Sequence, residues 1–85
     1  MQVGDDSMNF GEALAALRNG NKVSRSGWNG VGLWLELQVP DANSKMTLPY
    51  IFISYPPDAK NTPGARVPWL ASQTDVLATD WAVVG

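Results

Sequence analysis

The stretch Leu33-Trp34-Leu35-Glu36-Leu37-Gln38-Val39 decides the fold class of this chain. In an extended strand, successive side chains point to opposite faces. The three leucines and Val39 then share one face, which suits a hydrophobic core. The indole of Trp34 shares the other face with Glu36 and Gln38, and this face is left for another contact. Such one-sided alternation is typical of a strand in an antiparallel sheet.

A helix is predicted before this strand, from about Phe10 to Asn19. Asn9 and Glu12 have the spacing of a capping box, in which each side chain accepts a hydrogen bond from an amide at the helix start. Apolar residues then recur at helical spacing, and Gly20 follows as the stop. Residues 1–7 are predicted to be a flexible lead-in, and residues 8–85 a single domain.

The segment between this helix and the leucine-rich strand predicts a hairpin. Lys22–Arg25 alternates as a strand does, with Val23 on one face and Ser24 on the other. Asn29-Gly30 is the turn, because both residues tolerate a positive φ.

Three strands and one short helix are predicted downstream. The strands are Leu48–Tyr55, Arg66–Leu70 and Trp81–Val84, and the helix runs from the capping-box spacing Ser72–Asp75 to about Thr79. Two turn-rich loops, Pro40–Thr47 and Pro56–Ala65, separate the strands. The expected fold is α+β: a small antiparallel sheet of about four to five strands, an N-terminal helix, and a short helix in the C-terminal half.

Composition narrows the functional classes. With 85 residues the domain buries only about 60–65% of the surface of its unfolded chain, yet it carries four tryptophans. It has no cysteine for a thiolate nucleophile or zinc site and no histidine for a proton shuttle, which argues against catalysis but leaves an enzyme built on Asp, Glu or Lys possible. No metal-ligand spacing occurs, and we expect no metal or cofactor. No apolar run approaches a membrane span, and no signal segment opens the chain. The net charge of −2 argues against a nucleic-acid polymer as partner but allows a small anionic ligand.

The segment Arg25-Ser26-Gly27-Trp28-Asn29-Gly30 has two interpretations. It is a hairpin tip whose tryptophan folds back onto the sheet and whose arginine is solvated. Alternatively it is a recognition loop, in which Trp28 stacks on a flat ring, Asn29 bonds polar edges and Arg25 meets a phosphate.

The segment from Pro68 to Asp75 also has two interpretations. It is a strand followed by a capped helix, with Trp69 in the core. Alternatively, amides at the helix start bind an anion, while Asp75 accepts from a ribose hydroxyl or a base amine. Trp34, on a polar face, is predicted to lie at an interface or pocket wall, and Trp81 in the core.

Three segments together resemble the second Thoeris anti-defence family of small phage proteins. They are Phe10-Gly11-Glu12-Ala13-Leu14, Ser24-Arg25-Ser26-Gly27-Trp28-Asn29-Gly30, and the long stretch from Val67 to Trp81 that contains PWLASQTDVLATDW. The resemblance covers about residues 8–85.

This resemblance implies a non-enzymatic sponge. Such proteins bind and sequester glycocyclic ADP-ribose, an immune signal made by a bacterial TIR-domain protein, without cleaving it. Members also hold cyclic dinucleotides in a distinct pocket, and they form homotetramers with ligand pockets at subunit boundaries. The expected location is the cytoplasm of the infected bacterial host.

The ligand-binding residues that we predict combine aromatic, cationic and polar side chains. They are Arg25, Trp28, Asn29, Arg66, Trp69, Ser72, Gln73 and Asp75. Two other functions stay open: a protein–protein interaction module that inhibits a host defence component directly, and a nucleotide-degrading enzyme.

Overall fold

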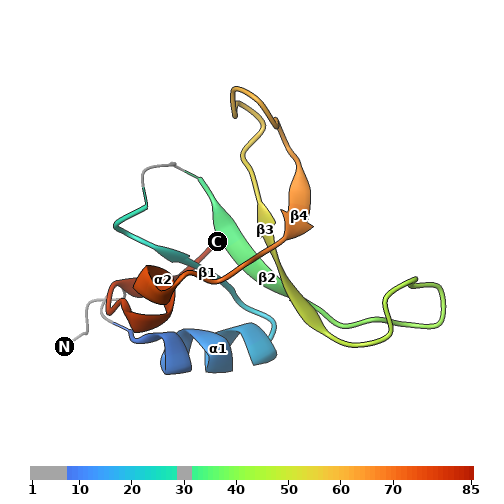
Figure 1. Ribbon diagram of the computed structural model, residues 1–85, viewed down its shortest axis with the longest axis horizontal. Helices are drawn as coiled ribbons and strands as arrows, with labels where there is room; N and C mark the ends of the chain where they lie inside the picture. Colours follow the sequence, from blue (N-terminus) through green and yellow to red (C-terminus); the bar gives the residue numbers. More distant parts are fainter. Residues whose placement is uncertain (1–7, 29–31) are drawn as a thin grey trace.

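The computed structural model describes residues 8–28 and 32–85. In chain order, the elements of these residues are α1 (Phe10–Arg18), β1 (Lys22–Arg25), β2 (Trp34–Gln38), β3 (Tyr50–Ser54), β4 (Arg66–Pro68), α2 (Gln73–Leu77) and β5 (Trp81–Val84). The strands form one antiparallel sheet in the order β4-β3-β2-β1-β5, and α1 contacts β1, β2 and β5 (Figure 1). The predicted α+β class is confirmed. Neither helix has the length and apolar character needed to cross a bilayer.

The predicted capping box starts α1. The Asn9 side chain accepts from the Glu12 amide at 2.8 Å, and the Glu12 carboxylate accepts from the Asn9 amide at 2.9 Å. The helix ends one residue earlier than predicted, with Asn19 as its C-cap, and Gly20 follows with a φ of 88°. That positive φ favours glycine, which explains why the helix stops there.

The leucine-rich strand lies at the centre of the sheet as β2. Leu35 pairs with Val23 on β1 and with Ile53 on β3, and its side chain is fully buried. Burial is less uniform than the alternation predicted, because Leu33 and Leu37 are only partly buried. Val39 lies beyond the end of the strand, where the chain enters a loop, and is 64% exposed.

The core lies between α1 and one face of the sheet. Within residues 8–28 and 32–85 it consists of five fully buried apolar side chains: Ala13, Leu17, Val23, Leu35 and Trp81. Trp81 is the largest of them, so its prediction as a core residue is confirmed. The segment before α1 also contacts Trp81, because Met8 and Trp81 form an antiparallel bridge.

Three downstream elements are shorter than predicted. β4 ends at Pro68 rather than Leu70, and β3 ends at Ser54 rather than Tyr55. β3 begins at Tyr50 rather than Leu48, because Pro49 has no amide to donate to a ladder. α2 ends at Leu77 rather than near Thr79. The predicted lead-in, residues 1–7, and the predicted turn, Asn29-Gly30, lie outside the described residues.

Two loops extend away from the body of the molecule in Figure 1. Residues 39–49 join β2 to β3, and residues 55–65 join β3 to β4. We call the first of these segments the 39–49 loop and the second the 55–65 loop.

Candidate functional site

Three aromatic side chains, Phe10, Trp28 and Trp69, form a cluster around Trp81. The Trp28 and Trp69 indoles meet it edge-on, with ring centroids 5.4 and 6.1 Å away, and Phe10 packs against it at 5.4 Å. Phe10 also contacts Trp69 at 6.0 Å. Trp28 and Trp69 are partly buried against the core, so Trp28 folds back onto the sheet instead of projecting as a free hairpin tip.

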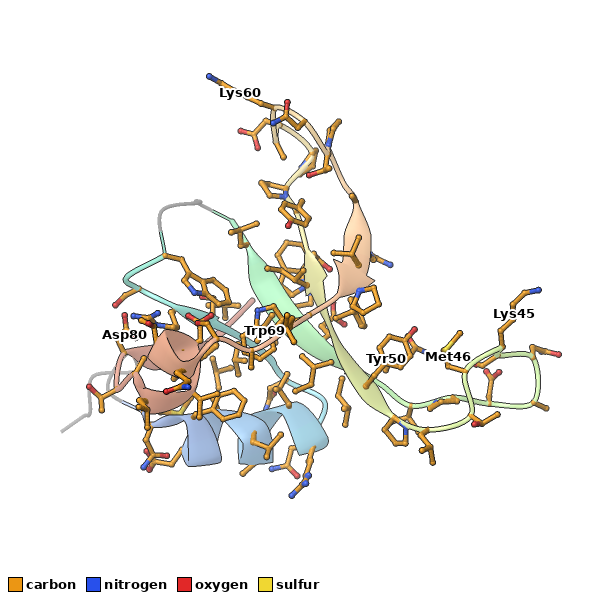
Figure 2. All side chains as sticks on the ribbon, viewed as in Figure 1. Lys45, Met46, Tyr50, Lys60, Trp69 and Asp80 are labelled. Carbon is orange, nitrogen blue, oxygen red and sulfur yellow. The ribbon has the colours of Figure 1, made fainter. Side chains whose placement is uncertain are left out.

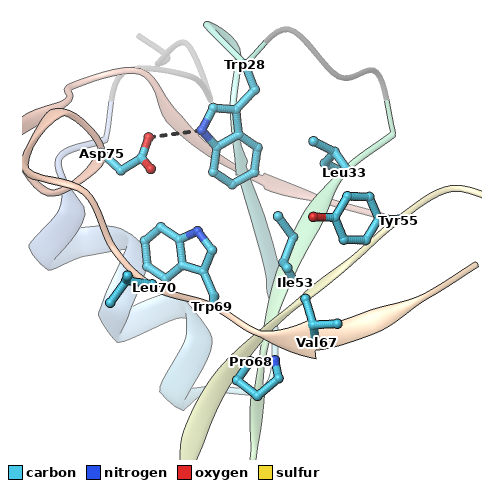
Figure 3. Close-up of a pocket in the computed structure, with 9 residues that line it drawn as sticks. All are labelled: Trp28, Leu33, Ile53, Tyr55, Val67, Pro68, Trp69, Leu70 and Asp75. Carbon is cyan, nitrogen blue, oxygen red and sulfur yellow. Dashed lines mark hydrogen bonds between the residues drawn. The ribbon is translucent and has the colours of Figure 1, made fainter. Parts of the chain in front are cut away.

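An open cavity of about 460 Å³ lies beside this cluster. The Trp28 and Trp69 indoles and Asp75 lie on one side of it, with Tyr55 and Val67 on the other (Figure 3). Most of its wall is aromatic or aliphatic. The full lining is Trp28, Leu33, Ile53, Tyr55, Val67, Pro68, Trp69, Leu70 and Asp75.

Asp75 links α2 to both neighbouring tryptophans. Its carboxylate accepts from the Trp28 indole N–H at 3.0 Å, and its backbone carbonyl accepts from the Trp81 indole N–H at 2.9 Å. The predicted second capping box is therefore only half formed. The Ser72 hydroxyl accepts from the Asp75 amide at 3.1 Å, but the Asp75 carboxylate turns toward Trp28 and Arg25.

Arg25, at the end of β1, bridges two carboxylates. Its Nη1 lies 2.7 Å from Asp75 Oδ1, and its Nε lies 2.7 Å from Asp80 Oδ1. Asp80 also accepts from the Gly27 amide at 2.7 Å. The arginine side chain is 16% exposed. Arg25 was predicted to contact phosphate, and in this chain its guanidinium is already bonded to two carboxylates.

These contacts shift the pKa values of all three groups. Hydrogen bonds to Asp80 and Asp75 raise the pKa of Arg25. The Arg25 hydrogen bond lowers the pKa of Asp80 against a smaller opposing effect of burial, and the Gly27 amide adds to the lowering. Burial alone would raise the pKa of Asp75, but the hydrogen bonds from Trp28 and Arg25 outweigh it and lower the pKa. Both aspartates are therefore ionised at neutral pH.

The remaining predicted residues are more scattered. Arg66 pairs with Ser54 on the sheet face that carries Trp34, and it lines a separate hollow of about 230 Å³ with Gln38, Tyr50 and Phe52. Ser72 and Gln73 are exposed at the start of α2, next to Asp75 in the chain but outside the cavity lining. Asn29 lies outside the described residues.

Trp34 lies on the sheet face opposite the core, as predicted. Its indole N–H donates to the Glu36 carboxylate at 2.7 Å, and the Lys22 ammonium lies 4.9 Å from the ring centroid. These contacts bring polar groups of its own sheet against the indole, and its position on the opposite sheet face separates it from the cavity beside Trp28.

The model of the Thoeris anti-defense 2-like domain matches residues 8–84. The chain belongs to that family. It is also similar to a protein named "Thoeris anti-defense 2" from Bacillus phage SP01. The two are 39% identical over 90 residues, which cover 91% of this chain and 94% of the relative. The resemblance noted in the sequence is confirmed, and the family assigns an anti-defence role that phage proteins exert in the host.

Sequence reasoning found only part of the cavity of this Thoeris anti-defense 2-like chain. The structure brings together Trp28, Trp69 and Asp75 from the predicted set. It adds Tyr55 and Leu33, among others, which were not predicted. The signal for Tyr55 was present, because Ile53 and Tyr55 continue a two-residue alternation on the core face past the end of β3.

Proposed function

We propose that this protein binds and sequesters a cyclic nucleotide immune signal, glycocyclic ADP-ribose made by a TIR-domain protein, without cleaving it. The effector of the bacterial defence then receives no signal. The site of this action in our proposal is the cytoplasm of the infected host. The observation that carries the proposal is the open cavity with two indoles and one ionised carboxylate in its wall (Figure 3).

The chemistry of the cavity suits a nucleoside. Its volume of about 460 Å³ falls in the range of small-molecule sites, roughly 300–1,000 Å³. Trp28 and Trp69 offer aromatic surface on which a purine can stack. Tyr55 and Asp75 offer polar groups for ribose hydroxyls, and Ser72 and Gln73 lie nearby at the start of α2.

The pyrophosphate of the ligand needs positive charge that the cavity lining does not provide. Among the described lining residues none is a lysine or arginine, and the adjacent Arg25 is bonded to Asp75 and Asp80. Arg66, the other cationic residue of the predicted set, faces away from this cavity. We therefore propose that the pocket is completed between subunits of a homotetramer, where a neighbouring copy supplies a cation such as Arg66.

Exposed apolar residues support assembly. On the 39–49 loop, Val39, Met46 and Leu48 are 64%, 56% and 75% exposed. Exposed apolar side chains gathered on one projecting segment favour a contact with another protein surface. We propose that a second copy of this chain covers them.

Cyclic dinucleotides are proposed as further ligands at a separate site. The hollow beside Arg66 also carries Tyr50 and Phe52, and so combines a cation with aromatic rings on the far face of the sheet. That combination suits phosphate together with a base.

Sequestration without cleavage agrees with the state of the acidic groups. A general acid must be protonated near neutral pH. Asp75 and Asp80 have lowered pKa values and accept hydrogen bonds from Arg25, so they stay ionised and occupied. Neither group is therefore suited to transfer a proton to a ligand, and only Asp75 lines the cavity.

Calorimetry with purified glycocyclic ADP-ribose, followed by heating of the complex and analysis of the released nucleotide, tests the proposal. Saturable heat and an intact nucleotide are expected. A cleaved product would show an enzyme. The absence of both binding heat and a thermal shift would favour a protein–protein interaction module. The exposed apolar side chains of the 39–49 loop would also suit such a module.

A further inference from the structure

We infer that Arg25 is a positioning residue of the cavity, which holds the Trp28 indole in place through Asp75 and does not contact the ligand. The inference rests on the proposed function, since it takes the cavity beside Trp28 as the nucleotide site. It assigns Arg25 a role different from the phosphate contact predicted from the sequence.

A continuous chain of contacts leads from Arg25 to the cavity wall. Arg25 Nη1 donates to Asp75 Oδ1 at 2.7 Å, and the same oxygen accepts from the Trp28 indole N–H at 3.0 Å. One carboxylate oxygen therefore joins the arginine to the tryptophan. Trp28 and Asp75 both line the cavity, whereas Arg25 does not (Figure 3).

The arginine is itself held at a second point. Its Nε donates to Asp80 Oδ1 at 2.7 Å, and Asp80 Oδ2 accepts from the Gly27 amide at 2.7 Å. This bond fixes the turn that leads from β1 to Trp28. Arg25 thus holds two groups in place. Through Asp80 it holds the segment before Trp28, and directly it holds the Asp75 carboxylate that accepts from the Trp28 indole N–H.

Asp75 needs this support because α2 provides little of its own. The helix has five residues, and none of them is fully buried. Helices this short are not stable in isolation, so their position depends on tertiary contacts. Besides Arg25, those contacts include the bonds of Asp75 to the Trp28 and Trp81 indoles.

The local charge argues against a phosphate contact at Arg25. One guanidinium faces two ionised carboxylates, which leaves a net negative charge around it. All three of its nitrogens point to carboxylate oxygens, at 2.7, 2.7 and 3.4 Å. A phosphate would have to displace an existing ion pair and would meet repulsion from the second carboxylate.

The test compares Arg25→Met with Arg25→Lys. Arg25→Met removes the charge and the donors, whereas Arg25→Lys keeps the charge but cannot bond Asp75 and Asp80 in the same fixed geometry. Indole N–H signals are recorded in ¹⁵N–¹H correlation spectra without ligand, with Trp28 assigned through Trp28→Phe. Glycocyclic ADP-ribose affinity is measured by calorimetry at two salt concentrations. Arg18→Met, at the exposed end of α1, is the matched control for loss of one arginine.

In Arg25→Met we expect the Trp28 indole signal to shift and its proton to exchange faster with water. We expect affinity to fall about tenfold with its salt dependence unchanged, because of the three bonds that the variant loses only the one to Asp75 leads to the cavity wall. Arg25→Lys should be intermediate in both readouts, and it decides the question if Arg25→Met does not fold. Arg18→Met should leave both unchanged.

An unchanged Trp28 indole signal in both Arg25 variants would overturn the positioning role. So would an affinity loss that is accompanied by a weaker salt dependence and fully rescued by lysine, since that pattern marks a phosphate contact. If the wild-type protein binds no nucleotide, the proposed function fails, but the indole spectra still decide whether Arg25 positions Trp28.

Discussion

Asp75 shows how one residue can organise a small site. Its carboxylate bonds Trp28 and Arg25, and its backbone carbonyl bonds Trp81. A carboxylate in this position would be costly if it were unpaired, because the surrounding rings exclude water from it. Its partners remove that cost and at the same time fix the orientation of two indoles. The hydrogen bonds that stabilise the partly buried Asp75 carboxylate therefore also position Trp28 in the cavity wall.

Trp28 is the residue whose loss should most directly weaken binding. Stacking of a base on an aromatic ring is worth about 1–3 kcal/mol, so Trp28→Ala should lower glycocyclic ADP-ribose affinity by about 5- to 150-fold. Trp28→Phe keeps a ring but loses the bond to Asp75, and should lie between wild type and Trp28→Ala. Calorimetry gives the affinities, and light scattering shows whether assembly is intact. Normal binding by an intact Trp28→Ala assembly would mean that Trp28 does not contact the ligand.

The acidic groups predict a loss of stability at low pH. The pKa values of Asp75 and Asp80 are lowered in the folded state, so the native protein binds fewer protons than the unfolded chain as pH falls. Their contribution is complete above about pH 5 and is lost as pH falls below the unfolded pKa of about 3.9. Arg25, whose pKa is raised, stays charged throughout.

Thermal unfolding followed by circular dichroism from pH 3 to 8 checks this. Asp80→Asn should be about 1–2 kcal/mol less stable than wild type at pH 7, below the middle of the range of about 1.5–3 kcal/mol for a hydrogen bond to a charged group, because the Asp80 side chain is 27% exposed. The difference should shrink toward pH 3, because Asp80 takes up a proton in the unfolded wild-type chain at a higher pH than in the folded protein. A difference that stays constant over the whole range would show that the Arg25–Asp80 pair contributes no pH-dependent stability.

At the scale of the elements, local signals and tertiary packing contributed differently. The capping box and Gly20 define α1 because both act within one turn of the chain. The alternation in β2 located the central strand, but not how deeply each leucine is buried. Burial depends on neighbours, and only Leu35 lies between Val23 and Ile53 under the helix. The end of α2 was missed because long-range bonds to Asp75 hold that helix, and no local stop signal marks its end.

The capping box predicts a measurable contribution of Asn9. Asn9→Ala removes the acceptor for the Glu12 amide and leaves an unpaired donor at the start of α1. We expect the free energy of unfolding in urea to fall by about 1 kcal/mol, with the denaturant slope unchanged. Ser72→Ala removes the corresponding acceptor at α2 and should matter less, because α2 buries no residue fully. Equal losses in the two variants would show that α2 contributes to the global fold as much as α1.

At the scale of the whole molecule, topology determines which predicted residues meet. The sequence predicted an antiparallel sheet, but the strand order β4-β3-β2-β1-β5 could not be predicted from it. That order places Trp69, which follows β4, and Trp28, which follows β1, against the same Trp81 ring. It also puts Arg66 on the opposite face of the sheet. The sequence predicted three of the residues that line the cavity, Trp28, Trp69 and Asp75, but their grouping required the strand order and register.

Assembly is the last property that the shape of the molecule makes testable. If a second copy covers the 39–49 loop, light scattering should give a particle of about 37 kDa, four times the 9.2 kDa chain. Leu48→Asp places a charge on that surface without touching the core, because Leu48 is 75% exposed, and should yield a smaller particle that still folds.

The 55–65 loop provides the control for this experiment. It also projects from the sheet but carries polar residues such as Lys60 at its tip, whereas Met46 lies on the 39–49 loop (Figure 2). Lys60→Asp should leave the mass unchanged. A folded Leu48→Asp protein with the wild-type mass would show that the 39–49 loop is not the contact. A 9.2 kDa wild-type particle would remove the support for a pocket shared between subunits.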